Sequence, residues 1–138
     1  MSLYEPLGGF DFIFTRLNPL ATGGAFVGIA PPDAATPYTV YSLQAGADLM
    51  VINGIRVWND GLYLVKACGP VDESAAVYAL AASNDAALHR QQNVSVESGA
   101  GVMLACVREQ TVVYSETVVN GGVWLNAGGL YRVYVQAS

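Results

Sequence analysis

The sequence Val57-Trp58-Asn59-Asp60-Gly61-Leu62-Tyr63-Leu64-Val65 recurs near the C-terminus as Val123-Trp124-Leu125-Asn126-Ala127-Gly128-Gly129-Leu130-Tyr131-Arg132-Val133. Each copy contains Val-Trp, then asparagine and glycine, then Leu-Tyr-x-Val. Glycine adopts backbone angles that other residues resist, as turns require, and residues two apart on a strand share a face. Each copy therefore predicts a strand, a turn and a second strand. One face of these second strands is predicted to carry Tyr63, Val65 and Ala67 in the first copy and Tyr131, Val133 and Val135 in the other.

Short apolar segments separated by turns surround these two units. The dipeptide Asn53-Gly54 is typical of a two-residue hairpin, because both positions tolerate positive φ. Many short strands at this spacing indicate an all-β sandwich or barrel, and one related unit in each half of the chain favours two Greek keys. The sequence thus predicts an all-β, antiparallel jelly-roll β-sandwich. Its predicted strands cover residues 10–15, 25–29, 38–44, 49–52, 55–58, 62–68, 94–96, 102–107, 111–119, 123–125 and 130–136.

Residues 74–91 allow two interpretations. Their alanine content favours a helix by intrinsic propensity. The alternative is a strand from Val77, a turn at Ser83-Asn84-Asp85 and a returning segment over residues 87–91. We prefer the strands.

The chain is predicted to form one domain with an extended N-terminal arm. Residues 1–37, which hold the arm and the first strands, carry Gly8-Gly9, Gly23-Gly24 and Pro31-Pro32 between apolar pieces. Such a segment can pair a strand or two and then extend over another subunit. The alternative is an irregular first strand packed on its own domain, which would be the sandwich of residues 38–138. On a strand, Phe10, Phe12 and Phe14 would share one face.

The composition restricts the possible partners. Of the 138 residues, 53% are hydrophobic and only 12% are charged, and the net charge is -5. With 6 Lys and Arg against 11 Asp and Glu, the chain is too poor in basic residues for the positive surface that binds phosphates. No window of about 20 residues lacks charges, glycine and proline together, and the first residues lack the positive charge of a signal peptide. We therefore expect neither a nucleic-acid partner nor a membrane partner.

The sequence holds no residue set that specifies a reaction. Cys68 and Cys106 each lie in an apolar run, which favours two buried free thiols over a disulfide. A zinc site would need more ligands than these two and His89. The serine nucleophile motif Gly-x-Ser-x-Gly is missing, and Asp72-Glu73 is typical of a solvated turn. We expect no metal, no cofactor and no catalytic residues, so the protein is predicted not to be an enzyme.

Large apolar groups are predicted on both faces of the repeated strands. A two-sheet sandwich buries only one face of each sheet, and the few charged residues cannot cover the other. Exposed apolar patches mark surfaces that bind partners. We therefore predict protein–protein contacts. The candidate interface residues are Leu3, Tyr4, Phe10, Phe12, Phe14, Trp58, Leu62, Leu64, Trp124, Leu130 and Tyr134.

The two Val-Trp…Gly-Leu-Tyr-x-Val units, in a short, acidic chain rich in Gly, Ala and Val, resemble the small jelly-roll cement or decoration proteins of tailed-bacteriophage capsids. The resemblance extends from about Tyr38 to the C-terminus and rests on pattern, so it transfers no functional residue. It implies a structural protein that is made in the bacterial host cytoplasm and binds the outer surface of the virion head. The implied partners are the major capsid protein, whose subunits it would bridge, and a second copy, with a homodimer preferred over a trimer.

Two other hypotheses belong to different functional classes. Trp58 or Trp124 could stack on sugars in a carbohydrate- or receptor-binding jelly-roll module of a phage tail. A small jelly-roll enzyme is disfavoured, because the sequence shows no cluster of histidine and acidic residues.

Overall fold

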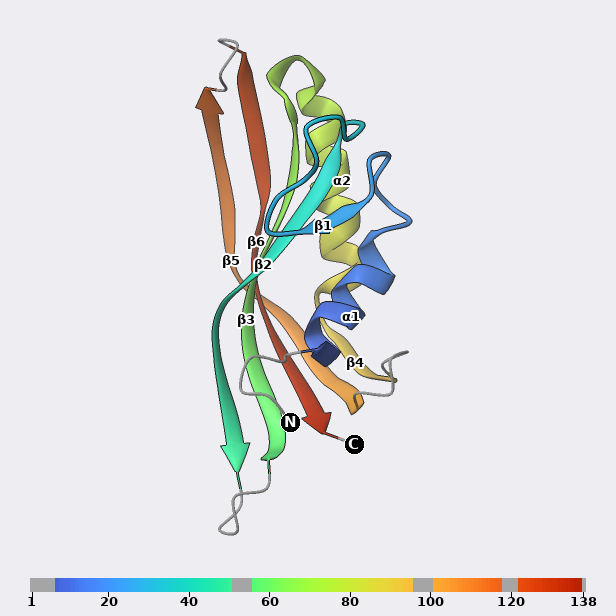
Figure 1. The fold of residues 1–138 in the computed structure, drawn as a ribbon, viewed down its shortest axis with the longest axis vertical. Coiled ribbons are helices and arrows are strands. Elements are labelled where there is room, and N and C mark those ends of the chain that lie inside the picture. Colours follow the sequence, from blue (N-terminus) through green and yellow to red (C-terminus); the bar gives the residue numbers. More distant parts are fainter. Residues whose placement is uncertain (1–6, 51–55, 96–100, 118–121, 138) are drawn as a thin grey trace.

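The computed structural model describes residues 7–50, 56–95, 101–117 and 122–137. These residues form two α-helices and six β-strands (Figure 1). In chain order the elements are α1 (Leu7–Leu17), β1 (Ala25–Val27), β2 (Tyr38–Met50), β3 (Arg56–Pro70), a 3-10 turn (Val71–Glu73), α2 (Ser74–Leu88), β4 (Gln91–Ser95), β5 (Gly101–Thr117) and β6 (Val123–Ala137).

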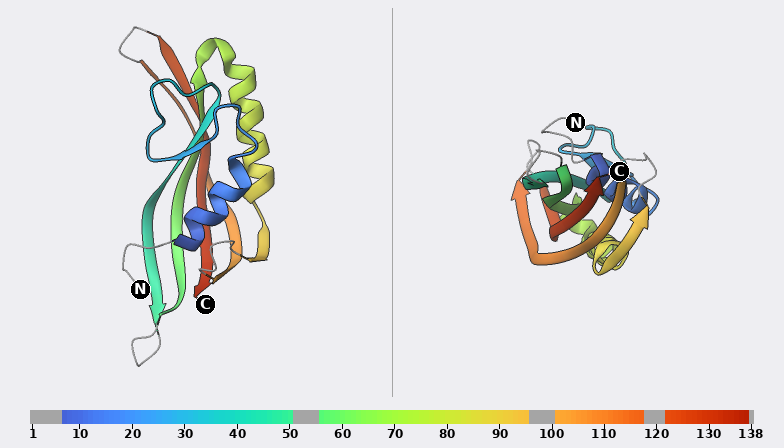
Figure 2. Two further views of the ribbon diagram at one scale, coloured as in Figure 1. Left: turned by 45° about the vertical axis from the view of Figure 1, so that its right-hand side comes forward. Right: turned by 90° about the horizontal axis from the view of Figure 1, so that it is seen from below.

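The strands form one sheet in the order β1-β2-β3-β6-β5-β4. β1 is parallel to β2, and the other neighbouring pairs are antiparallel. The sheet is long, twisted and curled, and both helices lie on one side of it (Figure 1, Figure 2). The prediction of a mostly β fold is confirmed. The predicted second sheet of a jelly-roll sandwich is replaced, in the described residues, by a layer of two helices.

Helix α2 corrects the interpretation of residues 74–91. These residues were predicted to form two strands and a turn, but residues 74–88 form one helix. The helical propensity of alanine determines the local structure here. Val77, Leu80 and Leu88 are buried, at a spacing that places them along one stripe of the helix facing the sheet.

Helix α1 likewise occupies part of the segment predicted as strand and extended arm. Its buried residues include Phe12, Ile13 and Leu17, which join the main core. Phe10 is half-buried and Phe14 is 44% exposed, so the three phenylalanines do not share one face. Three phenylalanines alternating over residues 10–14 are too short a pattern to distinguish a strand from a helix, because neighbouring residues of a helix also differ in burial.

Two predicted turns are wrong, because β3 and β6 run without interruption through 59–61 and 126–129. The glycines there serve close packing. A Cβ at Gly128 would overlap the Val65 carbonyl oxygen, and a Cβ at Gly129 would lie 2.7 Å from the Gln110 carbonyl oxygen. Glycine inside a strand often marks such a close approach or a bend of the sheet.

The two sequence repeats pair with each other at the centre of the sheet. Tyr63 on β3 lies opposite Tyr131 on β6, and Leu64 lies opposite Leu130. Tyr63, Tyr131, Val65 and Val133 are all at most 2% exposed and belong to one core cluster. The predicted inward face of both repeats is therefore confirmed.

Both cysteines are free and buried. Burial raises the pKa of the Cys68 thiol to about 11 and that of the Cys106 thiol to about 12. This confirms the preference for free thiols over a disulfide.

The burial of Tyr131 predicts a large effect of its truncation. Tyr131→Ala is expected to lower the free energy of unfolding by about 3–5 kcal/mol, because it removes a buried aromatic ring and leaves a cavity. Urea titration followed by circular dichroism measures this change. A loss well below 1 kcal/mol would contradict the assignment of Tyr131 to the core.

The raised pKa values predict destabilisation at alkaline pH. Burial raises the pKa of Cys68, Cys106, Tyr63 and Tyr131, so the unfolded chain loses these protons at lower pH than the folded chain does. The free energy of unfolding is therefore expected to fall as the pH rises from about 9 towards 12. Urea midpoints at several pH values test this. Replacing Cys106 by Ala should reduce the slope, and a midpoint independent of pH would contradict the prediction.

Candidate functional site

Two stretches at the edges of the sheet have no neighbouring strand among the described residues. β1 pairs with β2 only at residues 39–41, and β4 pairs with β5 only between residues 102 and 106. Just after the last β5 residue that pairs with β4, the backbone N–H of Arg108 donates to Nδ1 of His89 at 3.0 Å. The rest of β5 and the part of β2 after Tyr41 continue as edge strands.

The open part of β5 carries no charge over residues 111–115, which read Thr-Val-Val-Tyr-Ser. Val113 is 50% exposed and Tyr114 is 39% exposed. Natural proteins usually protect long edge strands with charges, proline or bulges. The register shift between Arg108 and Gln110 precedes this stretch, and residues 111–115 themselves have no such protection.

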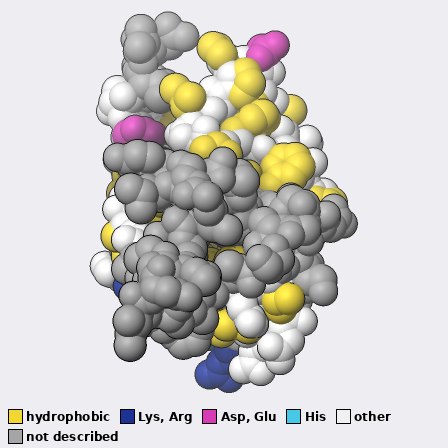
Figure 3. All heavy atoms as spheres, turned by 60° about the horizontal axis from the view of Figure 1, so that its bottom comes forward, with side chains coloured by type: hydrophobic (Ala, Val, Ile, Leu, Met, Phe, Trp, Pro, Cys, Tyr) yellow, Lys and Arg dark blue, Asp and Glu magenta, His cyan; other side chains and the backbone are white. Residues whose placement is uncertain are grey.

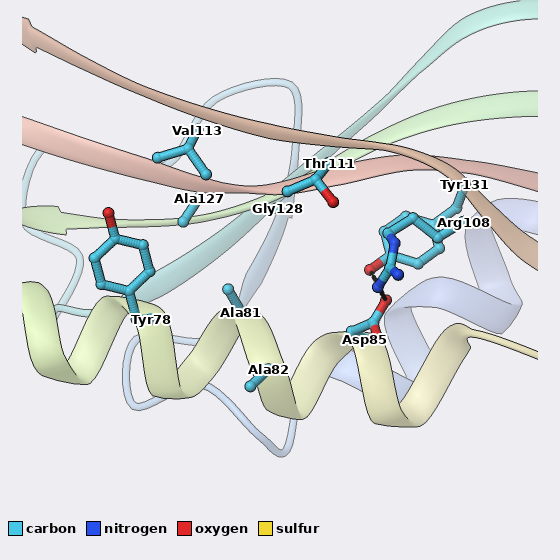
Figure 4. A pocket seen from close by; sticks show the side chains of 10 residues that line it. All are labelled: Tyr78, Ala81, Ala82, Asp85, Arg108, Thr111, Val113, Ala127, Gly128 and Tyr131. Atoms are coloured by element: carbon cyan, nitrogen blue, oxygen red, sulfur yellow. Dashed lines mark hydrogen bonds and ion pairs between the residues drawn. The ribbon is translucent and has the colours of Figure 1, made fainter.

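A groove of about 390 Å³ runs between this strand and helix α2 (Figure 4). The small side chains of Ala81 and Ala82 on the helix leave this space open in front of β5. Tyr78 lies at one end of the groove, and the pair of Asp85 and Arg108 lies at the other (Figure 4). The sheet side of the groove is lined by Arg108, Thr111, Val113, Ala127, Gly128 and Tyr131.

The polar end of the groove connects the helix to the sheet. The Tyr131 hydroxyl donates to Asp85 Oδ1 at 2.7 Å, and Arg108 forms an ion pair with the same oxygen at 2.6 Å. Burial, and then the hydrogen bond to Asp85, raise the pKa of Tyr131, so the hydroxyl remains a donor. Deeper in the protein, Asn84 Nδ2 donates to Thr39 Oγ1 at 3.0 Å. These contacts set the position of α2, and with it the shape of the groove.

The opposite face of the sheet combines leucines with an ion-pair network. Arg132 Nη1 lies 2.8 Å from Asp60, and Arg132 Nε lies 2.6 Å from Glu109. The hydrogen bond from Arg132 lowers the pKa of Glu109. The three charged residues come from β3, β5 and β6, so they fix the strands relative to one another and leave little net charge on this face.

A second polar cluster lies on the same face. Lys66 Nζ donates to the Tyr114 hydroxyl at 2.6 Å, and the Cys68 thiol donates to Asn126 Oδ1 at 3.0 Å. Asn126 Nδ2 in turn donates to Glu116 at 3.1 Å. Figure 3 views the molecule from its lower end and shows few charged side chains among the described residues there.

The structure brings only some of the predicted interface residues together. Leu62, Leu64, Leu130 and Tyr134 are half-buried and lie on neighbouring strands, on the face away from the helices. The phenylalanines belong to the helical layer on the other face; Phe10 packs against Tyr63, with a ring distance of 5.4 Å. Leu3 and Tyr4 lie outside the described residues.

The two tryptophans lie at opposite ends of the sheet. Trp124 is half-buried, and its ring lies 5.8 Å from that of Tyr38. Trp58 pairs in register with Gln136, and its side chain is outside the part that the structure describes. At about 3.3 Å per residue along β6, residues 124 and 136 are about 40 Å apart. The tryptophans therefore do not form one shared sugar-stacking surface.

Sequence reasoning missed the groove altogether. Its helix side consists of Tyr78, Ala81, Ala82 and Asp85, which were predicted to lie in strands and a turn. Helical propensity over residues 74–88 was the signal that could have revealed it.

The described residues contain no group of three or more His, Cys, Asp or Glu that could hold a metal ion. Among the same residues, no helix is long and apolar enough to cross a membrane.

Comparison with known proteins identifies the fold. No family model and no curated protein sequence matches the chain. A chain in the structure of the virion of a native gene transfer agent particle is 18% identical, with a TM-score of 0.55, over 91% of this chain and 92% of that chain. A second solved chain, whose name states no function, is 17% identical, with a TM-score of 0.56, over 96% of both. Both likenesses extend over almost the full length, so the chain shares a complete fold with them.

The polar end of the groove predicts a measurable coupling between two side chains. Asp85→Ala and Tyr131→Phe each remove one partner of the same hydrogen bond, and each is expected to lower the free energy of unfolding by about 1–3 kcal/mol. Because the bond is lost only once, the double variant should lose less than the sum of the two single variants. Urea titrations of the four proteins measure the coupling, and strict additivity would contradict it.

Proposed function

We propose that the chain is a structural protein of a phage-type particle and that it acts by binding other protein subunits. The observation that carries this proposal is the match of the whole fold to a chain from a gene transfer agent virion, over 91% of this chain and 92% of that chain. A match that covers nearly all of both chains supports a shared role as a subunit of such a particle.

The surface supports protein contacts as the means of action. Only 12% of the residues are charged, and the leucines on the face away from the helices are half-buried without a covering layer in the described residues. Open edge strands lie on both sides of the sheet. Apolar patches and open edges are the features through which proteins pair. The proposed partners are therefore proteins, and neither nucleic acid nor membrane.

The finer form of the proposal is the capsid cement role. In this role the chain binds the outer surface of the head, bridges neighbouring major capsid subunits and stabilises the shell. The net charge of -5 supports a position away from the packaged DNA. The mass action of binding would make the shell more resistant to heat, because each bound copy favours the assembled form.

The sheet edges favour a second candidate, a ring-forming subunit on the axis of the particle. The open parts of β2 and β5 lie on opposite sides of the sheet, so a contact between them joins two different surfaces of two copies. Such head-to-tail contacts close into rings when the rotation between copies permits. A ring suits a place where the particle itself has an axis, such as the junction of head and tail.

Locating the chain in purified particles tests both candidates. Particles from the organism that encodes the chain are separated into heads and tails, and an antibody to the chain is used for immunogold microscopy. Label over the whole head surface supports the cement role, and label at the head–tail junction supports the ring. Label at the tail tip would favour receptor binding instead. Absence of the chain from all particle fractions would overturn the proposal.

A further inference from the structure

The open edge of β5 and the groove beside it form one continuous surface. The edge offers backbone N–H and C=O groups beyond Arg108, and the groove lies along the side of the same strand that faces α2. A strand added to β5 would direct every second side chain towards α2. It would therefore cover Val113, which is 50% exposed, and Tyr78, which is also 50% exposed. Backbone pairing combined with a groove for alternate side chains is how proteins bind an added strand.

The chain itself contains a strand that fits this edge. β2 after Tyr41 has no neighbour on its outer side among the described residues, and residues 42–47 read Ser-Leu-Gln-Ala-Gly-Ala, without charge. Ala45 and Gly46 are exposed and small, so another strand can approach them closely. The segments 42–47 and 111–115 are thus similar in length and both uncharged. The register shift of β2 between Leu43 and Ala45 lies within the first of them.

The strand directions also agree. Successive antiparallel pairings of β2 with β3, β3 with β6 and β6 with β5 mean that β2 and β5 run in opposite directions (Figure 1). A second copy in the same orientation therefore presents β2 antiparallel to β5. The open parts are the C-terminal parts of both strands, so the second copy is shifted along the strand direction. A regular shift of this kind is what allows tilted strands to close into a barrel.

We propose that the open edge of β5 at residues 111–115, with the groove beside it, binds β2 of a second copy at residues 42–47 and extends the sheet from one copy to the next. This rests on the proposed function, since it names the contact by which a virion subunit joins its neighbour. This contact leaves neither the β2 edge nor the β5 edge open within a row of copies. A symmetric contact between two β5 edges would leave both β2 edges open.

Cysteine crosslinking of the full-length protein tests the contact. Thr111→Cys and Ala45→Cys place thiols at exposed positions on the two edges, whereas Cys68 and Cys106 are buried. With a short bismaleimide, a mixture of the two single variants is expected to give a crosslinked dimer on a denaturing gel, while each variant alone gives only uncrosslinked chains. A chain with both substitutions should give a ladder of oligomers. Wild-type protein, treated in the same way, controls for the native thiols.

Two outcomes would overturn the proposal. Dimers from Thr111→Cys alone would show that β5 pairs with β5, and the absence of crosslinks in the mixture, both in concentrated solution and in assembled particles, would show that the two edges do not meet.

A matched pair of lysine variants tests the groove. Val113→Lys places a charge in the groove, and Val71→Lys places one on the 3-10 turn at nearly the same exposure, 50% against 49%. In the crosslinking background, Val113→Lys is expected to abolish the dimer and Val71→Lys to retain it, with circular dichroism confirming that both are folded. Equal crosslinking in both variants would remove the groove from the contact.

The outcome also separates this inference from the proposed function. Particles that contain the chain but give no crosslink between positions 45 and 111 would overturn the inference and leave the virion role standing. Crosslinked oligomers of a chain that is absent from every particle would support the inference and overturn the virion role.

Discussion

The pairing of β3 with β6 is the contact on which the rest of the structure depends. It sets Tyr63 beside Tyr131 in the centre of the sheet, and both rings enter the core that α1 covers. Gly128, opposite Lys66 within this ladder, makes the pairing possible, because any side chain there would overlap the backbone of β3. The close approach permits the curl of the sheet, and the curl gives the helices a concave side to pack against.

The position of α2 follows from the same pairing through a few polar contacts. Tyr131 extends from β6 to Asp85 on the helix, and Asp85 also holds Arg108 of β5. Only one end of the helix is fixed to β5 in this way. Towards the other end, Ala81 and Ala82 are too small to fill the space in front of Val113. The groove is thus a direct consequence of where the helix carries its large and small residues.

The inward face of the sheet could be predicted from the sequence because alternation within a strand is a local property. Tyr63, Val65, Tyr131 and Val133 were assigned correctly on that basis. The turns at 59–61 and 126–129 could not be distinguished from strand in the same way. A glycine favours a turn by its conformational freedom, but Gly128 is used for its lack of a side chain, and only the neighbouring strand reveals this.

The candidate site was beyond prediction for a related reason. The continuous course of β5 through Arg108 to Gln110, the helix over residues 74–88 and the shortness of β1 and β4 together create an open edge beside a groove. Each of these features depends on pairing between segments far apart in the sequence. The predicted leucine face, by contrast, followed from the alternation of Leu62 and Leu64 alone, and the structure does place them on one face with Leu130.

The shortness of β1 and β4 is what leaves edges of the sheet open. If β1 and β4 ran the full length of their neighbours, β2 and β5 would have no open edge of their own. Instead each covers only a few residues of a much longer strand, and the uncovered parts lie at opposite ends of the sheet. Long uncharged edges are a liability for an isolated protein because they pair with any available strand. The segments 42–47 and 111–115 carry no charge, so in the proposed contact a partner strand would cover the parts of the two edges that charges do not protect. The same feature that makes these edges prone to pairing would then give each copy a directional contact to the next.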